Sequence, residues 1–251
     1  MRKLSNLESK LKERIIGQDV AVDAVARAVK RNRAGISYKK KPVSFIFAGP
    51  TGVGKTLLAK ELAKALFDRG DALLRLDMSE YAERHNMSRM IGSPPGYVGY
   101  GEGGRLTEAV RRQPYSVILL DEIEKAHPEV YNLLLQLFDE GHLTDGVGRR
   151  VDFRNTVIIM TSNLGSGERQ VSRGLGYYQP SQTTRNRSEE QRYLGAVEGH
   201  FSPEFVNRLD EIVCFDALDE EAVGRIVDLE LESLFERLAE LDVRVEITPA
   251  A

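Results

Sequence analysis

Residues 49–56 read Gly-Pro-Thr-Gly-Val-Gly-Lys-Thr, which fits the phosphate-binding pattern G-x-x-x-x-G-K-[ST]. Glycines let such a loop fold its backbone N–H groups around phosphate oxygens, at the positive end of a helix dipole. Lys55 is then expected to reach the β- and γ-phosphates, and the Thr56 hydroxyl to ligate Mg²⁺. An apolar run, residues 44–48, precedes the loop and a helical pattern, residues 57–63, follows it. This context favours nucleotide binding over a chance glycine-rich turn. The residues predicted to bind the phosphates are Gly49, Pro50, Thr51, Gly52, Val53, Gly54, Lys55 and Thr56.

Two further apolar runs end in polar side chains that suit phosphate chemistry. Residues 117–120 are followed directly by Asp121 and Glu122. The carboxyl end of a buried parallel strand is where α/β sheets bind ligands, so we expect Asp121 to hold Mg²⁺ and Glu122 to deprotonate the attacking water. One strand later, residues 158–162 carry Asn163 to the same edge. Its amide is expected to hydrogen-bond the γ-phosphate or the water; the alternative is that Asn163 only begins a loop.

The elements that must position these residues form a repeating pattern of short apolar runs and intervening helices. Near-continuous apolar strands that alternate with helices predict an α/β fold, with a parallel sheet covered on both faces. Residues 165–192 interrupt the pattern, and their Gly, Ser, Gln and Arg content predicts a long mobile surface loop. The predicted strands are residues 44–48, 73–76, 116–120, 155–161 and 211–215.

The end of the chain reads as the opening of another domain. Residues 218–241 carry a helical apolar stripe and residues 243–247 alternate as a strand. This tail is too short to bury a core of its own.

Composition excludes several classes of protein. A net charge of −3 provides no overall basic field of the kind that marks nucleic-acid binders. The single cysteine excludes a disulfide framework and fits a reducing compartment. The charged N-terminus is no signal peptide, and no apolar stretch reaches the length of a membrane span. We therefore predict a cytoplasmic protein with no membrane and no nucleic-acid partner.

Together these motifs resemble the AAA+ ATPases of the Clp unfoldase class, above all the second ATPase module of ClpB and ClpC. The resemblance runs from about Leu4 to the end of the chain. It is carried by the phosphate-binding loop, Asp121-Glu122, Asn163, and residues 77–81, 92–99, 114–116, 152–156 and 205–210.

The resemblance implies a AAA+ P-loop NTPase fold. A five-stranded parallel sheet flanked by helices would occupy residues 1–216, and residues 217–251 would begin a small α+β lid domain. Ile15 and Ile16 would line the adenine pocket. The chain stops before the Gly-Ala-Arg phrase that Clp modules carry in the small domain, so we expect a piece of a longer protein.

Arg208 would be the arginine finger that reaches the nucleotide of the adjacent subunit in a hexameric ring. A forked, permanently charged guanidinium suits phosphoryl oxygens that gain charge in the transition state. From the residues alone, a salt bridge between Arg208 and Asp210 or Glu211 is an equally good interpretation.

A glycine-flanked aromatic loop is a second candidate functional segment, separate from the nucleotide site. Glycines around Tyr97 and Tyr100 indicate a flexible loop that exposes large rings. The resemblance implies that Tyr97, Val98 and Tyr100 grip a threaded polypeptide in the central pore; the alternative is a tyrosine packed on the core. Residues 141–150 are expected to face the same channel.

The implied activity is an ATP- and Mg²⁺-dependent motor that unfolds or disaggregates polypeptides by threading them through a homo-hexameric pore. One alternative is an unfoldase that feeds a ClpP-like peptidase, docked through Leu175, Gly176 and Tyr177. The other is a AAA+ remodeller of nucleic acid, which would need basic residues on the pore loop, whereas Arg89 and Arg105 only flank it.

Overall fold

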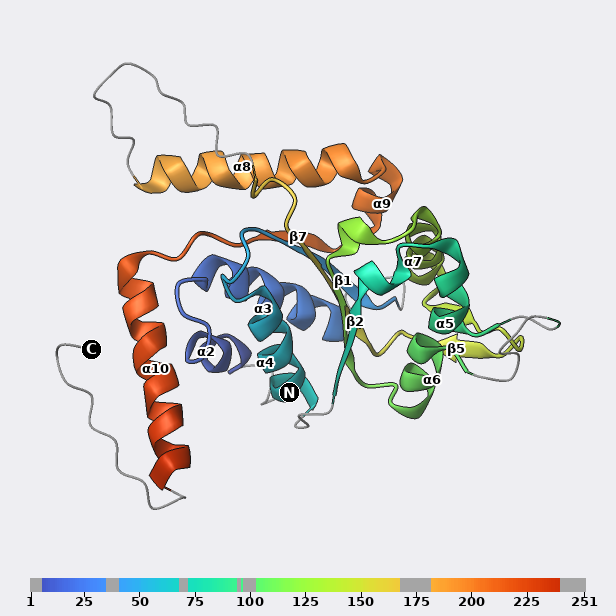
Figure 1. Cartoon of the computed structure of the whole chain (residues 1–251), viewed down its shortest axis with the longest axis horizontal. Helices are drawn as coiled ribbons and strands as arrows, with labels where there is room; N and C mark the ends of the chain where they lie inside the picture. Colours follow the sequence, from blue (N-terminus) through green and yellow to red (C-terminus); the bar gives the residue numbers. More distant parts are fainter. Residues whose placement is uncertain are drawn as a thin grey trace. The chain divides into compact units, whose positions relative to one another are not determined.

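A computed structural model describes residues 6–34, 41–67, 72–93, 96, 103–167 and 182–239. The chain divides into two compact units, residues 1–216 and residues 217–251. The first unit contains a five-stranded sheet in the order β2-β3-β6-β1-β7, with every neighbouring pair parallel (Figure 1). The predicted five-stranded parallel sheet is thus confirmed. Its strands are β1 (Val43–Ala48), β2 (Leu73–Asp77), β3 (Val117–Asp121), β6 (Val157–Ser162) and β7 (Glu211–Cys214).

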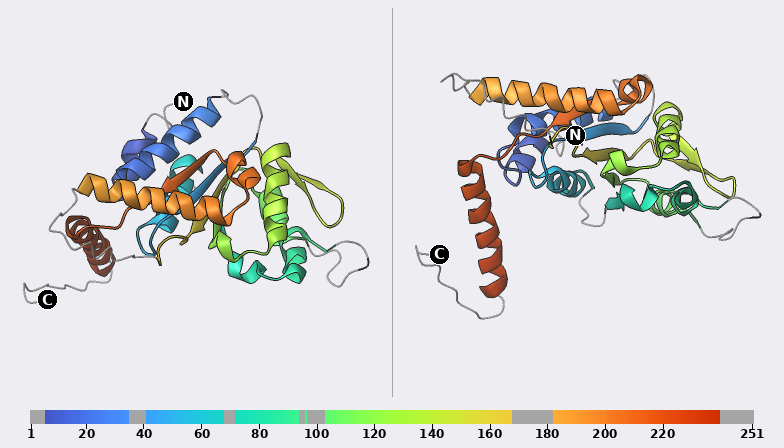
Figure 2. Two further views of the ribbon diagram at one scale, coloured as in Figure 1. Left: turned by 90° about the horizontal axis from the view of Figure 1, so that it is seen from above. Right: turned by 45° about the horizontal axis from the view of Figure 1, so that its top comes forward.

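The central strands are buried along their whole length because helices cover both faces of the sheet. All residues of β1 and β6 are buried, which explains why these strands read as continuous apolar runs rather than alternating ones. Figure 2 shows α8 (Gln182–His200) and α4 (Lys55–Phe67) on opposite sides of the sheet. The remaining elements around β1 and β7 are α2 (Leu7–Lys12), α3 (Asp19–Arg33) and α9 (Pro203–Arg208).

The segment between β2 and β6 supplies short helices and a hairpin beside the β2 end of the sheet. Helix α7 begins with His127 as N-cap and Pro128 in its first turn, and ends at Gly141, whose φ of 70° is the left-handed conformation that glycine favours. The antiparallel pair β4–β5 follows; its three-residue strands are too short to show a sequence period. These elements are η1 (Met78–Tyr81), η2 (Arg84–Asn86), α5 (Met87–Ile91), α6 (Arg105–Arg112), η3 (Ile123–Lys125), α7 (Pro128–Glu140), β4 (His142–Thr144) and β5 (Arg150–Asp152).

The prediction of a surface loop over residues 165–192 is wrong from residue 182 onward, because α8 begins there. The helix is anchored by Tyr193 and Val197, which lie one turn apart and are fully buried in the core. The polar composition of this segment suggested a loop, but burial of Tyr193 and Val197 in the core holds it as a helix. The predicted contact residues Tyr97, Val98 and Tyr100, and Leu175, Gly176 and Tyr177, lie outside the described residues.

The second unit, as described, consists of helix α10 (Glu220–Ala239), close to the predicted bounds. Asp219 precedes it and accepts a hydrogen bond from the backbone N–H of Ala222 at 2.8 Å, as an N-cap does. The predicted strand at residues 243–247 lies outside the described residues. None of the helices in the described part of the chain combines the length and apolar character that crossing a membrane requires.

Candidate nucleotide-binding site

The predicted phosphate-binding loop joins β1 to α4 and opens into a cavity of about 420 Å³. Gly49, Gly52 and Gly54 all adopt positive φ, at 149°, 83° and 105°. At Gly49 a Cβ atom would lie 2.7 Å from the carbonyl oxygen of Phe215, so only glycine fits beside β7. Because α4 begins at Lys55, its unpaired N–H groups face the loop. The cavity is lined by Thr51, Gly52, Gly54, Lys55, Thr56, Leu57, Arg75, Asp77, Asp121, Glu122, Thr161 and Asn163.

Lys55 is a buried cation held by oxygen atoms. Its Nζ donates to the carbonyl oxygens of Gly49 and Pro50, at 2.6 and 2.7 Å, and to Oδ1 of Asn163 at 2.9 Å. Burial lowers the pKa of Lys55 to about 8, although the nearby carboxylates, Glu124 foremost, oppose that shift. All three oxygen partners of the ammonium group are neutral, so an anion such as phosphate can replace them.

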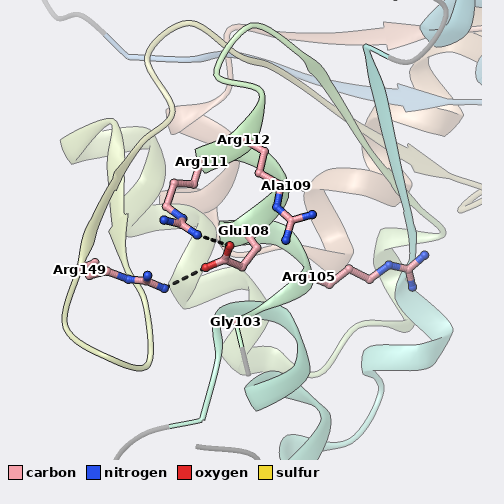
Figure 3. A pocket seen from close by; sticks show the side chains of 7 residues that line it. All are labelled: Gly103, Arg105, Glu108, Ala109, Arg111, Arg112 and Arg149. Carbon is pink, nitrogen blue, oxygen red and sulfur yellow. Dashed lines mark hydrogen bonds and ion pairs between the residues drawn. The ribbon is translucent and has the colours of Figure 1, made fainter. Parts of the chain in front are cut away.

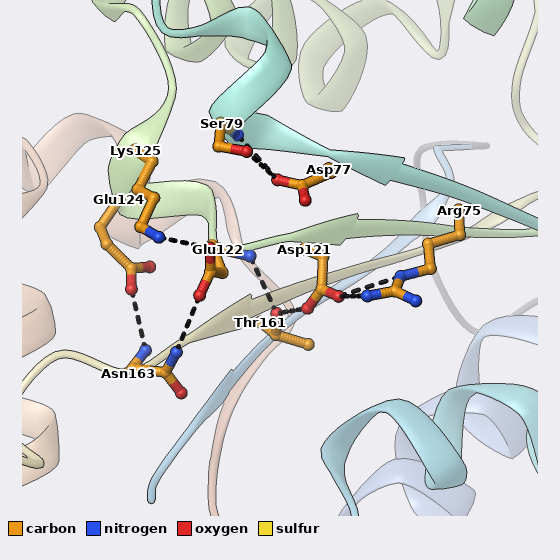
Figure 4. Close-up of polar contacts among 9 residues, drawn as sticks. All are labelled: Arg75, Asp77, Ser79, Asp121, Glu122, Glu124, Lys125, Thr161 and Asn163. Carbon is orange, nitrogen blue, oxygen red and sulfur yellow. Dashed lines mark hydrogen bonds and ion pairs between the residues drawn. The ribbon is translucent and has the colours of Figure 1, made fainter. Parts of the chain in front are cut away.

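Asp121 lies at the end of β3, with both carboxylate oxygens engaged (Figure 4). Oδ2 accepts from Nε and Nη2 of Arg75 at 3.0 and 2.5 Å, and Oδ1 accepts from the hydroxyl of Thr161 on β6. Asp121 and Thr56 line one cavity and are hard oxygen donors of the kind that Mg²⁺ takes in nucleotide sites, where phosphates and water complete its shell. Among the described residues, no group of three or more His, Cys, Asp or Glu side chains is arranged to hold a metal ion by itself.

Glu122 is held in an unusual backbone conformation at the cavity. Its φ of 56° makes it the sole non-glycine residue with positive φ in the described part of the chain, and its N–H donates to Oγ1 of Thr161 at 3.1 Å. Its Oε2 accepts from Nζ of Lys125 at 2.6 Å, and its Oε1 lies 3.5 Å from Nδ2 of Asn163. Because Asn163 also accepts from Lys55, one amide connects the buried cation to the carboxylate.

Five predicted nucleotide contacts are not part of the cavity lining: Gly49, Pro50 and Val53 of the loop itself, and Ile15 and Ile16. Ile15 and Ile16 are buried, with 3% and 8% of their surface exposed. The neighbouring Gln18 donates to the carbonyl oxygens of Val53 and Asp216 at 3.3 and 2.9 Å. Gln18 thus ties this segment to the phosphate-binding loop; the role of Ile15 and Ile16 in adenine binding stays a prediction.

Arg208 is separate from the cavity of its own chain. It ends α9 and forms an ion pair with Asp139 of α7, and a second, longer one with Glu204 at 3.9 Å. Its partner is therefore neither Asp210 nor Glu211; Asp210 instead accepts from the N–H of Ser44 at 2.9 Å.

Sequence reasoning missed Arg75, Thr161 and Lys125, which hold the two acidic residues of the site. The signals were the polar Arg75 inside the apolar run of β2 and the hydroxyl of Thr161 near the end of β6. The hydroxyl of Thr161 lies in a fully buried strand and so needs a partner, but the sequence does not say which.

A second hollow, of about 510 Å³, is rich in arginine but its charges are largely paired (Figure 3). Glu108 of α6 accepts from Arg111 at 2.6 Å and from Arg149 at 2.8 Å, and Arg105 pairs with Glu80 at 3.3 Å. These pairs join α6 to η1 and to the β4–β5 hairpin. We interpret this cluster as structural.

Comparisons with known proteins agree with the geometry. The family model described as AAA domain (Cdc48 subfamily) matches residues 40–212. The chain is 53% identical over 250 residues to the negative regulator of genetic competence ClpC/MecB of Bacillus subtilis (strain 168), covering 99% of this chain and 31% of that protein. It is 55% identical over 250 residues to the chaperone protein ClpB of Propionibacterium freudenreichii subsp. shermanii, covering 99% of this chain and 28% of that protein.

A closed-state cryo-EM reconstruction of Hsp104 with ATPyS and FITC casein matches the fold with a TM-score of 0.84 and 40% identity. It covers 98% of this chain and 41% of that one. The chain thus spans less than a third of the length of these curated relatives. The resemblance to the Clp class, predicted from the motifs, is confirmed. Since the family model covers more than half of the chain, the protein belongs to the AAA domain family, Cdc48 subfamily.

Proposed function

We propose that this chain is the ATP-hydrolysing module of a motor that unfolds or disaggregates polypeptides. The observation that carries the proposal is the connected set Lys55, Asn163 and Glu122 at the phosphate-binding loop. A cation for the ground-state phosphates, an amide and a carboxylate base within one cavity are the parts that hydrolysis of a nucleoside triphosphate needs. Membership of the AAA family supports nucleotide binding at this cavity.

Each residue has a distinct role in the proposed reaction. The N–H groups of the loop and the ammonium of Lys55 bind the phosphates, while Thr56 and Asp121 hold the magnesium ion, which would neutralise phosphate charge. Glu122 accepts the proton of the attacking water, and Asn163 orients that water or the γ-phosphate. Ile15 and Ile16 are proposed to contact the adenine.

The proposed action on polypeptides rests on similarity. Relatives carry the name chaperone protein ClpB, and the matching Hsp104 reconstruction contains FITC casein. We infer that the complete protein is a cytoplasmic homo-hexamer in which Tyr97, Val98 and Tyr100 contact the threaded chain. Arg208 then acts on the nucleotide of the adjacent subunit, and residues 217–251 begin the lid domain. No described feature favours nucleic acid as a substrate.

Separate substitutions of Lys55 and Glu122 test the proposed hydrolysis. Lys55→Ala is expected to abolish tight ATP binding, because Lys55 neutralises phosphate in the ground state. Glu122→Gln should keep binding and lower turnover by about 100-fold or more, since Glu122 acts on the water only during reaction. Calorimetry and phosphate release measure the two effects. Asp152→Asn, an exposed carboxylate outside the cavity, is the control. Normal turnover by Glu122→Gln in the complete protein contradicts the assignment.

Coupling to a peptidase is a second candidate function, because one relative is named ATP-dependent Clp protease ATP-binding subunit ClpC, from Staphylococcus saprophyticus, at 52% identity. Leu175, Gly176 and Tyr177 would then dock a ClpP-like peptidase, and burying their apolar groups around a ring would add avidity. Pull-down of the peptidase by the complete protein, with and without residues 174–179, tests this. Binding that needs these residues supports docking, and no binding by either protein contradicts it.

A further inference from the structure

Arg75 is a cation at the proposed magnesium site that the reaction described above does not use. It lies in β2, and its guanidinium reaches diagonally to the neighbouring strand β3, where it makes two hydrogen bonds to the same oxygen of Asp121. Figure 4 shows the two side chains meeting at this edge of the sheet. Arg75 also lines the cavity, together with Thr56 and the phosphate-binding loop.

The carboxylates that line the cavity are each held by a different group. Asp77 accepts from the N–H and hydroxyl of Ser79 at 2.9 and 2.6 Å. Glu122 accepts from Lys125. Asp121 is paired with Arg75, at 2.5 Å for the shorter contact. The carboxylate proposed to hold the metal ion is therefore the one that an arginine neutralises.

Arg75 and a metal ion would place two positive charges on the one carboxylate of Asp121. Oδ1 is taken by the hydroxyl of Thr161 and Oδ2 by two N–H groups of Arg75. Mg²⁺, or water in its shell, would use the remaining lone pairs of this carboxylate, where the positive charge of the adjacent guanidinium repels the ion. The Arg75 side chain is 56% exposed and that of Asp121 14%, so the guanidinium lies on the solvent side and can leave at little cost.

We propose that Arg75 and Mg²⁺ compete for Asp121. The guanidinium neutralises this carboxylate in the metal-free site, and the ion displaces it when the magnesium–nucleotide complex binds. Arg75 therefore sets the magnesium concentration at which the nucleotide is held tightly. This inference rests on the proposed nucleotide-binding function.

The test measures how magnesium controls binding of a fluorescent ADP by the chain itself. Affinity for ADP rises with free Mg²⁺, and the midpoint of this rise is the quantity compared. The affinity at saturating Mg²⁺ should be unchanged in Arg75→Gln. The midpoint in this variant should lie at about three- to fivefold lower free Mg²⁺ than in wild type. A change of this size is what an exposed ion pair provides, since it corresponds to about 0.6–1 kcal/mol. Arg154→Gln is the matched control, because Nε and Nη2 of Arg154 likewise donate to one oxygen of Asp152, away from the cavity.

Thermal unfolding with saturating ADP at graded Mg²⁺ is a second readout that needs no catalysis: the magnesium midpoint for stabilisation should shift in the same direction. In an Asp121→Asn background, Arg75→Gln should have no further effect on the magnesium dependence. An unchanged magnesium midpoint in Arg75→Gln overturns the inference. Weaker binding at saturating Mg²⁺ also overturns it, because Arg75 would then contact the phosphates. If wild type itself does not bind ADP with Mg²⁺, the proposed function fails instead.

Discussion

Lys55 shows how one buried charge couples binding to pH. Burial lowers its pKa to about 8 from an ordinary value of 10.5, so the folded chain loses this proton first as pH rises. Below pH 8 both the folded and the unfolded chain carry the proton. Between about pH 8 and 10.5 the unfolded chain binds more protons, so this group makes the free energy of unfolding rise with pH. Phosphate binding, in contrast, weakens as pH rises through this range, because it needs the charged form of Lys55.

Nucleotide affinity should therefore fall by about tenfold per pH unit above pH 8, and binding near pH 8.5 should take up a proton. Calorimetry in two buffers of different ionisation enthalpy measures both quantities. Lys55→Arg is the control, since a guanidinium stays charged throughout this range; its affinity should not depend on pH. A wild-type affinity that is constant from about pH 7.5 to 9.5 contradicts this account of Lys55.

At the scale of elements, the β4–β5 hairpin depends on a buried carboxylate in its turn. Asp145 is only 6% exposed and accepts from the N–H groups of Val147 and Arg149, at 3.1 and 2.8 Å, and from Nε of Arg149 at 2.7 Å. Arg149 in turn reaches Glu108 of α6. This chain of contacts fixes the hairpin to the body of the domain, in the region expected to face the channel.

Asp145→Ala should lower the free energy of unfolding by about 2–3 kcal/mol, because three hydrogen bonds to a buried carboxylate are lost together. Urea denaturation of the isolated chain measures the change. Asp152→Ala is the matched control: its pair with Arg154 is about half exposed, so the loss should stay below about 1 kcal/mol. Equal losses in the two variants would show that the turn does not depend on Asp145.

At the scale of the whole molecule, Arg208 is proposed to act on the nucleotide of an adjacent subunit; in its own chain it pairs with Asp139 and does not line the cavity. Arg208→Ala should change the nucleotide affinity of the isolated chain by less than about twofold, yet sharply lower turnover of the assembled complete protein. Fluorescence titration and phosphate release give the two values. Glu204→Gln, which removes only the 3.9 Å contact, serves as control. A tenfold loss of affinity in the isolated chain, about 1.4 kcal/mol, would mean that Arg208 acts within its own subunit.

The proposed threading requires that Tyr97 contact the polypeptide in the assembled molecule. Tyr97→Ala should leave ATP hydrolysis within about twofold of wild type and abolish unfolding of a tagged fluorescent client, whereas Tyr97→Phe should be mild because the ring face makes the contact. Both activities are compared in the complete protein. If Tyr97→Ala lowers both equally, the tyrosine is structural.

Local patterns in the sequence determined the five strands of the parallel sheet, the phosphate-binding loop and the polar ends of β3 and β6. Each depends on neighbouring residues: an apolar run long enough to be a buried strand, glycines where φ is positive, and acids directly after a strand. The amino-acid sequence alone therefore suffices to assign Asp121, Glu122 and Asn163 to one edge of a parallel sheet.

Only the tertiary structure decided which side chains meet. Lys55 contacts Asn163 across 108 residues, Arg75 contacts Asp121 across 46, and Arg208 contacts Asp139 across 69. The strand order β2-β3-β6-β1-β7 sets the first two partners, and this order differs from the order along the chain. The contact between Arg208 and Asp139 depends on how α9 packs against α7. The start of α8 likewise depends on tertiary structure, because Tyr193 and Val197 anchor this helix in the core. Such pairings follow from packing over the whole sheet, so no local pattern encodes them.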